Sequence, residues 1–171
     1  MTEQKQKQVF EKIEKHFGFL PNLFKNFDGF PVGAEAFATF ASLIIEHTPE
    51  NKLPLLQPEI EYLGVKTSEE NQCKYCQTHH QTALQQLLKD ASNTIPENKR
   101  AALDNLAHII AKEPHKAGND VLKNKFKEAG YTDAQFKHAV MVVNVFCVSN
   151  RWNLANSTGI EENFNLIYKL G

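Results

Sequence analysis

The stretch that most constrains the fold is AVMVVNVFCV, residues 139–148, because it is apolar on almost every face of a helix. A surface helix would carry a polar stripe, and here only Asn144 interrupts the apolar residues. The stretch is also shorter than the roughly 20 apolar residues that a bilayer-spanning helix needs. We therefore expect a helix at the centre of a soluble core, beginning at a capping box formed by Thr132 and Gln135.

The remaining segments also have helical periodicity, and no series of segments alternates as strands do. Further helices are predicted over about 9–17, 31–46, 58–67, 71–88, 94–110 and 121–129, with a short last helix that includes Phe164, Ile167 and Leu170.

Glycine, proline and capping residues mark the ends of these predicted helices. Gly18 closes the first, Pro31 and Pro58 open the second and third, and Asn71 and Thr94 are predicted N-caps for the fourth and fifth. No linker is long enough to separate domains. The sequence therefore predicts an all-α bundle with one domain over residues 1–171.

Composition excludes several classes of protein. The net charge is -1, from 19 basic and 20 acidic residues in 171, and no basic block favours nucleic acid or an anionic membrane. The polar start, MTEQKQKQ, lacks the apolar core of a signal peptide. Three cysteines are too few, and odd in number, for a secreted disulfide scaffold, so we expect a cytoplasmic protein in which Cys147 is simply buried.

Phenylalanine is concentrated in one part of the chain. Seven of the twelve lie between Phe17 and Phe40. This indicates an ordinary hydrophobic core, with an apolar pocket or a subunit interface as the alternative.

The sequence NQCKYCQTHH, residues 71–80, brings two thiols and two imidazoles close together. On a helix, Cys73, Cys76 and His80 share one face, because they are spaced by three and four residues. That face continues through apolar residues toward Leu87. His79 is about 100° further round the helix and should point elsewhere.

A pair of cysteines at the start of a helix is typical of thiol–disulfide exchange, because the first-turn amides stabilise a thiolate. His80 is placed to take a proton from Cys76, and Glu59 or Glu61 on the preceding helix is a candidate to orient the imidazole. Gly64 would let another helix come close and partly enclose Glu61.

A zinc site is the main alternative for this cluster. Cys73, Cys76 and His80, with either Glu61 or His79, would supply four ligands. A second ligand pair from a distant knuckle is missing from the sequence, so a redox dithiol is preferred and neither metal nor cofactor is expected. A purely structural role is the third possibility.

Glu61, Cys73, Cys76 and His80 form the pattern Glu-x11-Cys-x2-Cys-x3-His. This pattern resembles the active-site motif of the alkylhydroperoxidase D-like branch of the carboxymuconolactone decarboxylase superfamily. GFLPNLF near residue 18, AGYTD at 129–133 and VSNRWN at 148–153 also look like segments of its peroxidase-related members. The decarboxylase branch shares the fold but lacks the paired thiols.

The resemblance implies an all-helical fold, assembly as a trimer or hexamer, and antioxidant thiol peroxidase or disulfide oxidoreductase activity. Cys76 would attack the peroxide, His80 and Glu61 would relay its proton, and Cys73 would resolve the sulfenic acid as a disulfide. The implied reductant is a dithiol partner, such as a lipoylated or thioredoxin-like protein, and a peroxiredoxin is a further implied partner. A redox sensor without turnover is the remaining alternative.

Two features of the motif bear on reactivity. The helix dipole favours Cys73 as the more acidic thiol, whereas the proton relay favours Cys76, and we take Cys76 as the nucleophile because a positioned base acts on one sulfur. The characterised member of the family that this motif resembles has a histidine between its two cysteines, where this chain has Lys74 and Tyr75. A tyrosine, with a usual pKa of about 10, is not a base near neutral pH.

Overall fold

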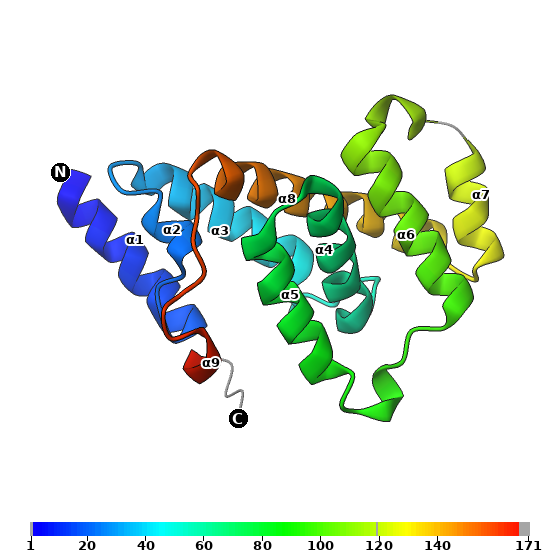
Figure 1. Cartoon of the computed structure of the whole chain (residues 1–171), viewed down its shortest axis with the longest axis horizontal. Helices are drawn as coiled ribbons and strands as arrows, with labels where there is room; N and C mark the ends of the chain where they lie inside the picture. Colours follow the sequence, from blue (N-terminus) through cyan, green and yellow to red (C-terminus); the bar gives the residue numbers. More distant parts are fainter. Residues whose placement is uncertain (1, 119, 168–171) are drawn as a thin grey trace.

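The computed structural model describes residues 2–118 and 120–167, and every regular element in these ranges is helical (Figure 1). This confirms the predicted all-α class. The α-helices are α1 (Thr2–Phe17), α2 (Asn22–Lys25), α3 (Pro31–Ile45), α4 (Gln57–Asn71), α5 (Lys74–Leu87), α6 (Glu97–Lys112), α7 (Asp120–Glu128), α8 (Asp133–Ala155) and α9 (Phe164–Ile167), with short 3₁₀ turns at Ala91–Asn93 and Pro114–Lys116.

The central helix predicted from the apolar run is α8. It contacts α3, α4, α5, α6 and α7, and Figure 1 shows it running along the long axis behind the α4–α5 pair. Val142, Val143 and Phe146 are fully buried on it, and Cys147 is buried too, as expected. Although α8 is the longest helix, none in the described ranges has the length and hydrophobicity required to cross a bilayer.

The predicted capping box at the start of α8 is confirmed. The Thr132 hydroxyl accepts a hydrogen bond from the Gln135 amide at 3.2 Å, and the Gln135 side chain accepts one from the Thr132 amide at 2.9 Å. Both first-turn donors are therefore satisfied before the buried part of the helix begins.

The prediction that Asn71 caps α5 is wrong. Asn71 is the last residue of α4, and Gln72 follows it in the left-handed conformation with φ 60°. The amides of Gln72 and Cys73 donate back to the carbonyls of Glu69 and Ser68, which is the hydrogen-bonding pattern of a Schellman motif. This tight reversal makes Cys73 the N-cap of α5.

The prediction that Thr94 caps α6 is also wrong. A cap at Thr94 would require a helical Ile95 directly before Pro96, and the proline ring disfavours that conformation. The structure instead places Pro96 at the N-cap, with φ -57° and ψ 148°, and α6 begins at Glu97. The predicted last helix corresponds to α9, which includes Phe164 and ends at Ile167. Leu170, which the sequence also assigns to this helix, lies outside the described residues.

Part of the phenylalanine-rich region forms a second core, as the sequence indicated, whereas Phe17 and Phe30 are exposed. Phe24 and Phe27 are buried between α1, α2 and α3, and Phe27 stacks on Trp152 of α8 with ring centroids 4.1 Å apart. This packing holds the first three helices against the end of α8 and, as described below, beside the cysteines.

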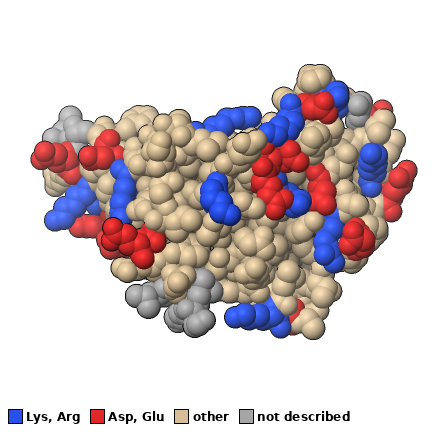
Figure 2. Space-filling view, viewed as in Figure 1, with Lys and Arg blue, Asp and Glu red and all other residues tan. Residues whose placement is uncertain are grey.

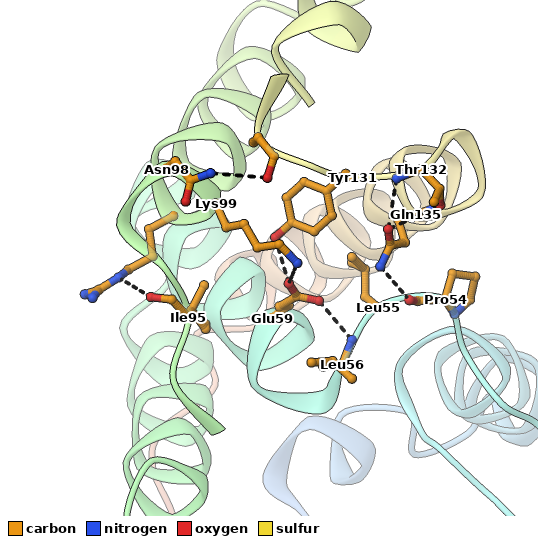
Figure 3. Close-up of polar contacts among 12 residues, drawn as sticks. Pro54, Leu55, Leu56, Glu59, Ile95, Asn98, Lys99, Tyr131, Thr132 and Gln135 are labelled. Carbon is orange, nitrogen blue, oxygen red and sulfur yellow. Dashed lines mark hydrogen bonds and ion pairs between the residues drawn. The ribbon is translucent and has the colours of Figure 1, made fainter. Parts of the chain in front are cut away.

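Glu59 has a structural place in the fold. The residue is 2 % exposed, and its carboxylate accepts hydrogen bonds from Tyr131 at 2.9 Å, the Leu56 amide at 3.0 Å and Lys99 at 3.3 Å (Figure 3). These contacts join α4 to α6 and to the segment before α8. Glu59 is therefore engaged on the side of α4 away from the cysteines, which leaves Glu61 as the carboxylate for His80.

Charged side chains of both signs lie on the face of the molecule seen in Figure 2. Figure 2 shows lysine and arginine side chains interspersed with aspartate and glutamate over the face in view. This distribution agrees with the near-zero net charge.

Candidate active site

The first turn of α5 holds two thiols side by side. The Sγ atoms of Cys73 and Cys76 are 2.9 Å apart, and both residues are 2 % exposed. A disulfide bond is about 2.05 Å long, so the two sulfurs are unbonded and share a hydrogen bond. The pair is thus in its reduced form.

The two thiols of this pair ionise very differently. The hydrogen bond between the two thiols lowers the pKa of Cys73 to about 7, against the effect of burial and with help from the amides of Cys76 and Tyr75 and the charge of His80. The same hydrogen bond, burial and the charge on Cys73 raise the pKa of Cys76. One proton therefore leaves the pair easily and the second is retained.

Two side chains of α8 contact the Cys76 sulfur. The Asn153 Nδ2 lies 3.2 Å from Sγ, and the Ser149 Oγ lies 3.7 Å from it. All three residues are buried. Both α8 side chains lower the pKa of Cys76, although they do not outweigh the causes that raise it.

Glu61 and His80 meet directly. The His80 Nδ1 donates to the Glu61 Oε2 at 2.8 Å, and the other carboxylate oxygen accepts from Gln57 at 3.0 Å. The two side chains are 13 % and 21 % exposed, so the pair is largely shielded from water. Because the carboxylate only accepts, the proton of a neutral His80 is on Nδ1, and Nε2 is left as the proton acceptor.

Gly64 allows this pairing, as predicted. A Cβ atom at this position would lie 2.9 Å from the His80 ring and 2.8 Å from the Phe146 ring. The His80 ring also packs edge-on against Phe146, with centroids 4.4 Å apart. The imidazole is therefore held between α4 and α8.

The contact expected between His80 and a sulfur is not made. Within the described part of the chain, no hydrogen bond joins the His80 ring to Cys73 or Cys76. Cys76 and His80 instead line a common cavity.

This cavity has a volume of about 170 Å³ and lies between α1–α3 on one side and α5 and α8 on the other. Cys76, His80 and Ser149 line it, whereas Cys73 does not. The opposite wall carries the aromatic residues Phe17, Phe19, Phe24 and Phe37, and Tyr75 and Phe146 add two aromatic rings on the same side as Cys76.

A second histidine, His79, also lines this cavity and is paired with a carboxylate, that of Glu161. The His79 Nε2 donates to the Glu161 Oε2 at 2.7 Å, and the Tyr75 hydroxyl donates to the Glu161 Oε1 at 2.8 Å. His79 thus points away from the dithiol face, as its helical position predicted. Burial raises the pKa of Glu161, but the bonds from His79, the Asn22 amide and Tyr75 together outweigh it and lower that pKa to about 2.

Sequence reasoning missed Glu161, Ser149 and Asn153. Glu161 follows α8 in an irregular segment, and no pattern connects it with Tyr75 and His79 some 80 residues earlier. Ser149 and Asn153 did carry a signal, because they are polar residues one turn apart directly after the apolar run of α8.

The zinc alternative needs at least three of its ligand side chains to converge on one point. Across residues 2–118 and 120–167, no group of three or more His, Cys, Asp and Glu side chains is arranged in this way. The imidazole of His80 is directed to Glu61 and that of His79 to Glu161. The donor set therefore does not fit a metal in this arrangement.

Comparison with known proteins gives similarity at the level of structure. No family model and no curated protein matches the chain. Among solved structures, an alkylhydroperoxidase AhpD core, a peroxidase-related protein from Ralstonia eutropha JMP134, is 24% identical with a TM-score of 0.77, covering 95% of this chain and 88% of that one. A peroxidase-related protein from Silicibacter sp. TM1040 is 20% identical with a TM-score of 0.74, covering 94% and 87%.

The debrominase Bmp8 also has this fold. Its apo structure is 20% identical with a TM-score of 0.66, covering 96% of this chain and 90% of that one, and a cysteine-to-alanine variant of Bmp8 has been solved with 2,3,4-tribromopyrrole. The chain therefore has the helical fold of AhpD-like, peroxidase-related proteins, as the sequence resemblance predicted.

Proposed function

We propose that this protein is a thiol-dependent peroxidase that reduces an organic hydroperoxide with the Cys73–Cys76 dithiol. The observation that carries the proposal is the unbonded thiol pair, 2.9 Å apart, with one sulfur facing a cavity that His80, paired with Glu61, also lines. The lowered pKa of Cys73 gives the thiol pair a negative charge near neutral pH.

In the proposed first step, the Cys76 thiolate attacks the distal oxygen of the peroxide. The O–O bond breaks, the sulfur becomes a sulfenic acid, and the leaving alkoxide takes a proton through His80, which Glu61 orients. Cys76 is the attacking sulfur because it lines the cavity and Cys73 does not.

In the second step, the Cys73 thiol attacks the sulfenic sulfur and water leaves. The net change is two thiols and one hydroperoxide to one disulfide, one alcohol and one water. The short distance between the sulfurs supports this step. A dithiol donor, such as a lipoylated or thioredoxin-like protein, then reduces the disulfide by exchange.

Two cysteine variants test this scheme. Cys76→Ser should abolish peroxide-dependent loss of free thiols, whereas Cys73→Ser should stop at a sulfenic acid on Cys76 that dimedone traps and mass spectrometry locates. Cys147→Ser is the matched control and should behave like the parent, because this thiol is buried on α8 away from the cavity lining. Equal peroxide consumption by all three variants would refute the scheme.

Reductive dehalogenation is a second candidate, favoured by the aromatic cavity wall and by the debrominase that shares the fold. Two thiols would supply two electrons, giving a disulfide, the reduced arene, a halide ion and a proton. Halide release from a bromopyrrole with no peroxide present would support this activity. Disulfide formation with no turnover on either substrate class, even with a dithiol donor, would instead indicate a redox sensor.

We also propose that the chain forms a homo-oligomer. Most residues of α3 are apolar, yet only Pro31 and Ala34 of this helix are buried. Val32 and Leu43 are 55% and 58% exposed, and Met141 and Val148 on α8 are 40% and 47% exposed. Apolar surface of this kind is typical of a subunit interface.

A further inference from the structure

We propose that Asn153 is a catalytic residue, which works by donating a hydrogen bond to the Cys76 sulfur and so holds negative charge on the thiol that faces the cavity. Ser149 assists it. The proposal deepens the peroxidase function and rests on it in this respect: Cys76 must carry the charge in order to attack.

The orientation of the Asn153 amide is determined by its neighbours. Its Nδ2 lies 3.0 Å from the Ser149 carbonyl oxygen, and a carbonyl can only accept a hydrogen bond. The atom facing Ser149 must therefore be the amino nitrogen. The same nitrogen lies 3.2 Å from the Cys76 sulfur and 3.3 Å from the Ser149 hydroxyl oxygen, so its second hydrogen is directed toward these two neighbouring acceptors.

The contact is buried and selective. Asn153 is 2 % exposed, and its Oδ1 has no hydrogen-bond partner within the described residues. This orientation leaves a buried oxygen unsatisfied while both N–H groups are used, one of them on the sulfur. A hydrogen bond to a charged group at a buried site stabilises that charge more than it would in water.

The thiol pair explains why such a donor is needed. The charge rests more easily on Cys73, at the N-cap of α5, but Cys73 does not line the cavity. For attack, the shared proton must move across 2.9 Å to Cys73, which leaves the charge on Cys76. Asn153 and Ser149 contact only the Cys76 sulfur of the pair, so they favour this second arrangement.

The test measures Cys76 acidity without any peroxide. In a Cys73→Ser background, the rate of alkylation of Cys76 by iodoacetamide is followed against pH, with the modified peptide identified by mass spectrometry. Asn153→Leu keeps the side-chain shape and removes the donor. We expect the apparent pKa of Cys76 to rise by about one unit, which slows alkylation about tenfold at a fixed pH below that pKa.

Asn144→Leu is the matched control. Its Nδ2 also donates to the carbonyl four residues back on α8, that of Val140, but Asn144 is exposed and touches no sulfur. It should leave the pH profile of alkylation unchanged. Circular dichroism confirms that each variant is folded.

Ser149→Ala provides a second variant if Asn153→Leu does not fold. It should raise the pKa of Cys76 in the same direction, by less, because Oγ lies further from Sγ. The proposal is overturned if neither folded variant raises this pKa. Alkylation needs no peroxide, so a chain that proves not to be a peroxidase still gives a clear result for Asn153.

Discussion

Gly64 shows how much one absent side chain contributes to the site. The space that a Cβ would occupy is filled by the rings of His80 and Phe146. His80 can therefore lie close to α4 and donate to Glu61, only three residues before the glycine. The glycine positions the imidazole although it takes no part in the chemistry.

Replacing Gly64 by alanine should displace the His80 ring and lengthen its bond to Glu61. We expect peroxidase activity to fall at least about tenfold, with a loss of stability of about 1–3 kcal/mol from overpacking. Turnover assays and urea unfolding measure the two effects. Gly118→Ala is the control, since a Cβ there meets nothing within 4 Å. Parental turnover in Gly64→Ala would show that His80 position is unimportant.

Sequence reasoning worked at the residue scale where helical spacing was enough. Cys73, Cys76 and His80 share a face because the spacing along one helix sets their directions. Asn153 is 77 residues from Cys76. Its contact depends on how α5 and α8 pack against each other, and periodicity within one helix carries no information about that.

At the scale of elements, the segment that follows α8 is fastened to both α2 and α5. Glu161 accepts from the Asn22 amide at 2.8 Å as well as from Tyr75 and His79. Asn22 in turn donates through its side chain to the Gly159 carbonyl at 2.9 Å. The hydroxyl of Tyr75, between the two cysteines in sequence, therefore anchors a distant segment of the chain.

The stability that these Glu161 contacts contribute should be lost at acid pH. The pKa of Glu161 is lowered from 4.5 to about 2 on folding, so its contribution is fully present above pH 4.5 and is lost as the pH falls through 2. We expect about 1–2 kcal/mol of stability to depend on this group, after allowance for solvent screening. Urea unfolding between pH 6 and pH 2 should show a shallower decline for Glu161→Gln than for the parent.

Glu162→Gln is the control for this measurement, because Glu162 is the adjacent and exposed carboxylate. Its pH profile should follow that of the parent. If Glu161→Gln also follows the parent, the Glu161 contacts do not stabilise the fold.

Helix ends were harder to predict than helices. The capping box at Thr132 was predicted correctly, because no proline or left-handed residue next to it shifts the start of the helix. Asn71 and Thr94 failed as caps because a left-handed Gln72 and a proline at position 96 moved each start by two residues. The shift matters functionally, since it placed Cys73 at the N-cap.

At the scale of the whole molecule, the all-α class followed from periodicity, and the central position of α8 followed from its lack of a polar face. Within one chain, however, Met141 and Val148 of this helix are still exposed. The apolar run of α8 therefore contains more apolar residues than one subunit buries, which agrees with the proposed assembly into an oligomer.

Leu43→Glu should weaken that assembly. A charge placed on the exposed face of α3 would be buried in the proposed interface without a partner, so multi-angle light scattering should report smaller species. Val121→Glu is the matched control, since Val121 is similarly exposed at 59% but lies on α7 at the other end of the molecule. A Leu43→Glu protein that keeps the parental mass would exclude α3 from the interface.

The N-cap position of Cys73 has a consequence for the energy of electron transfer. A sulfur that ionises near pH 7 stabilises the dithiol form, and closing the disulfide removes that charge from the first turn of α5. The midpoint potential of the couple should therefore be less negative than that of an unperturbed dithiol. A disulfide of this kind accepts electrons more readily than an unperturbed one, which would favour its reduction by a dithiol donor in the proposed cycle.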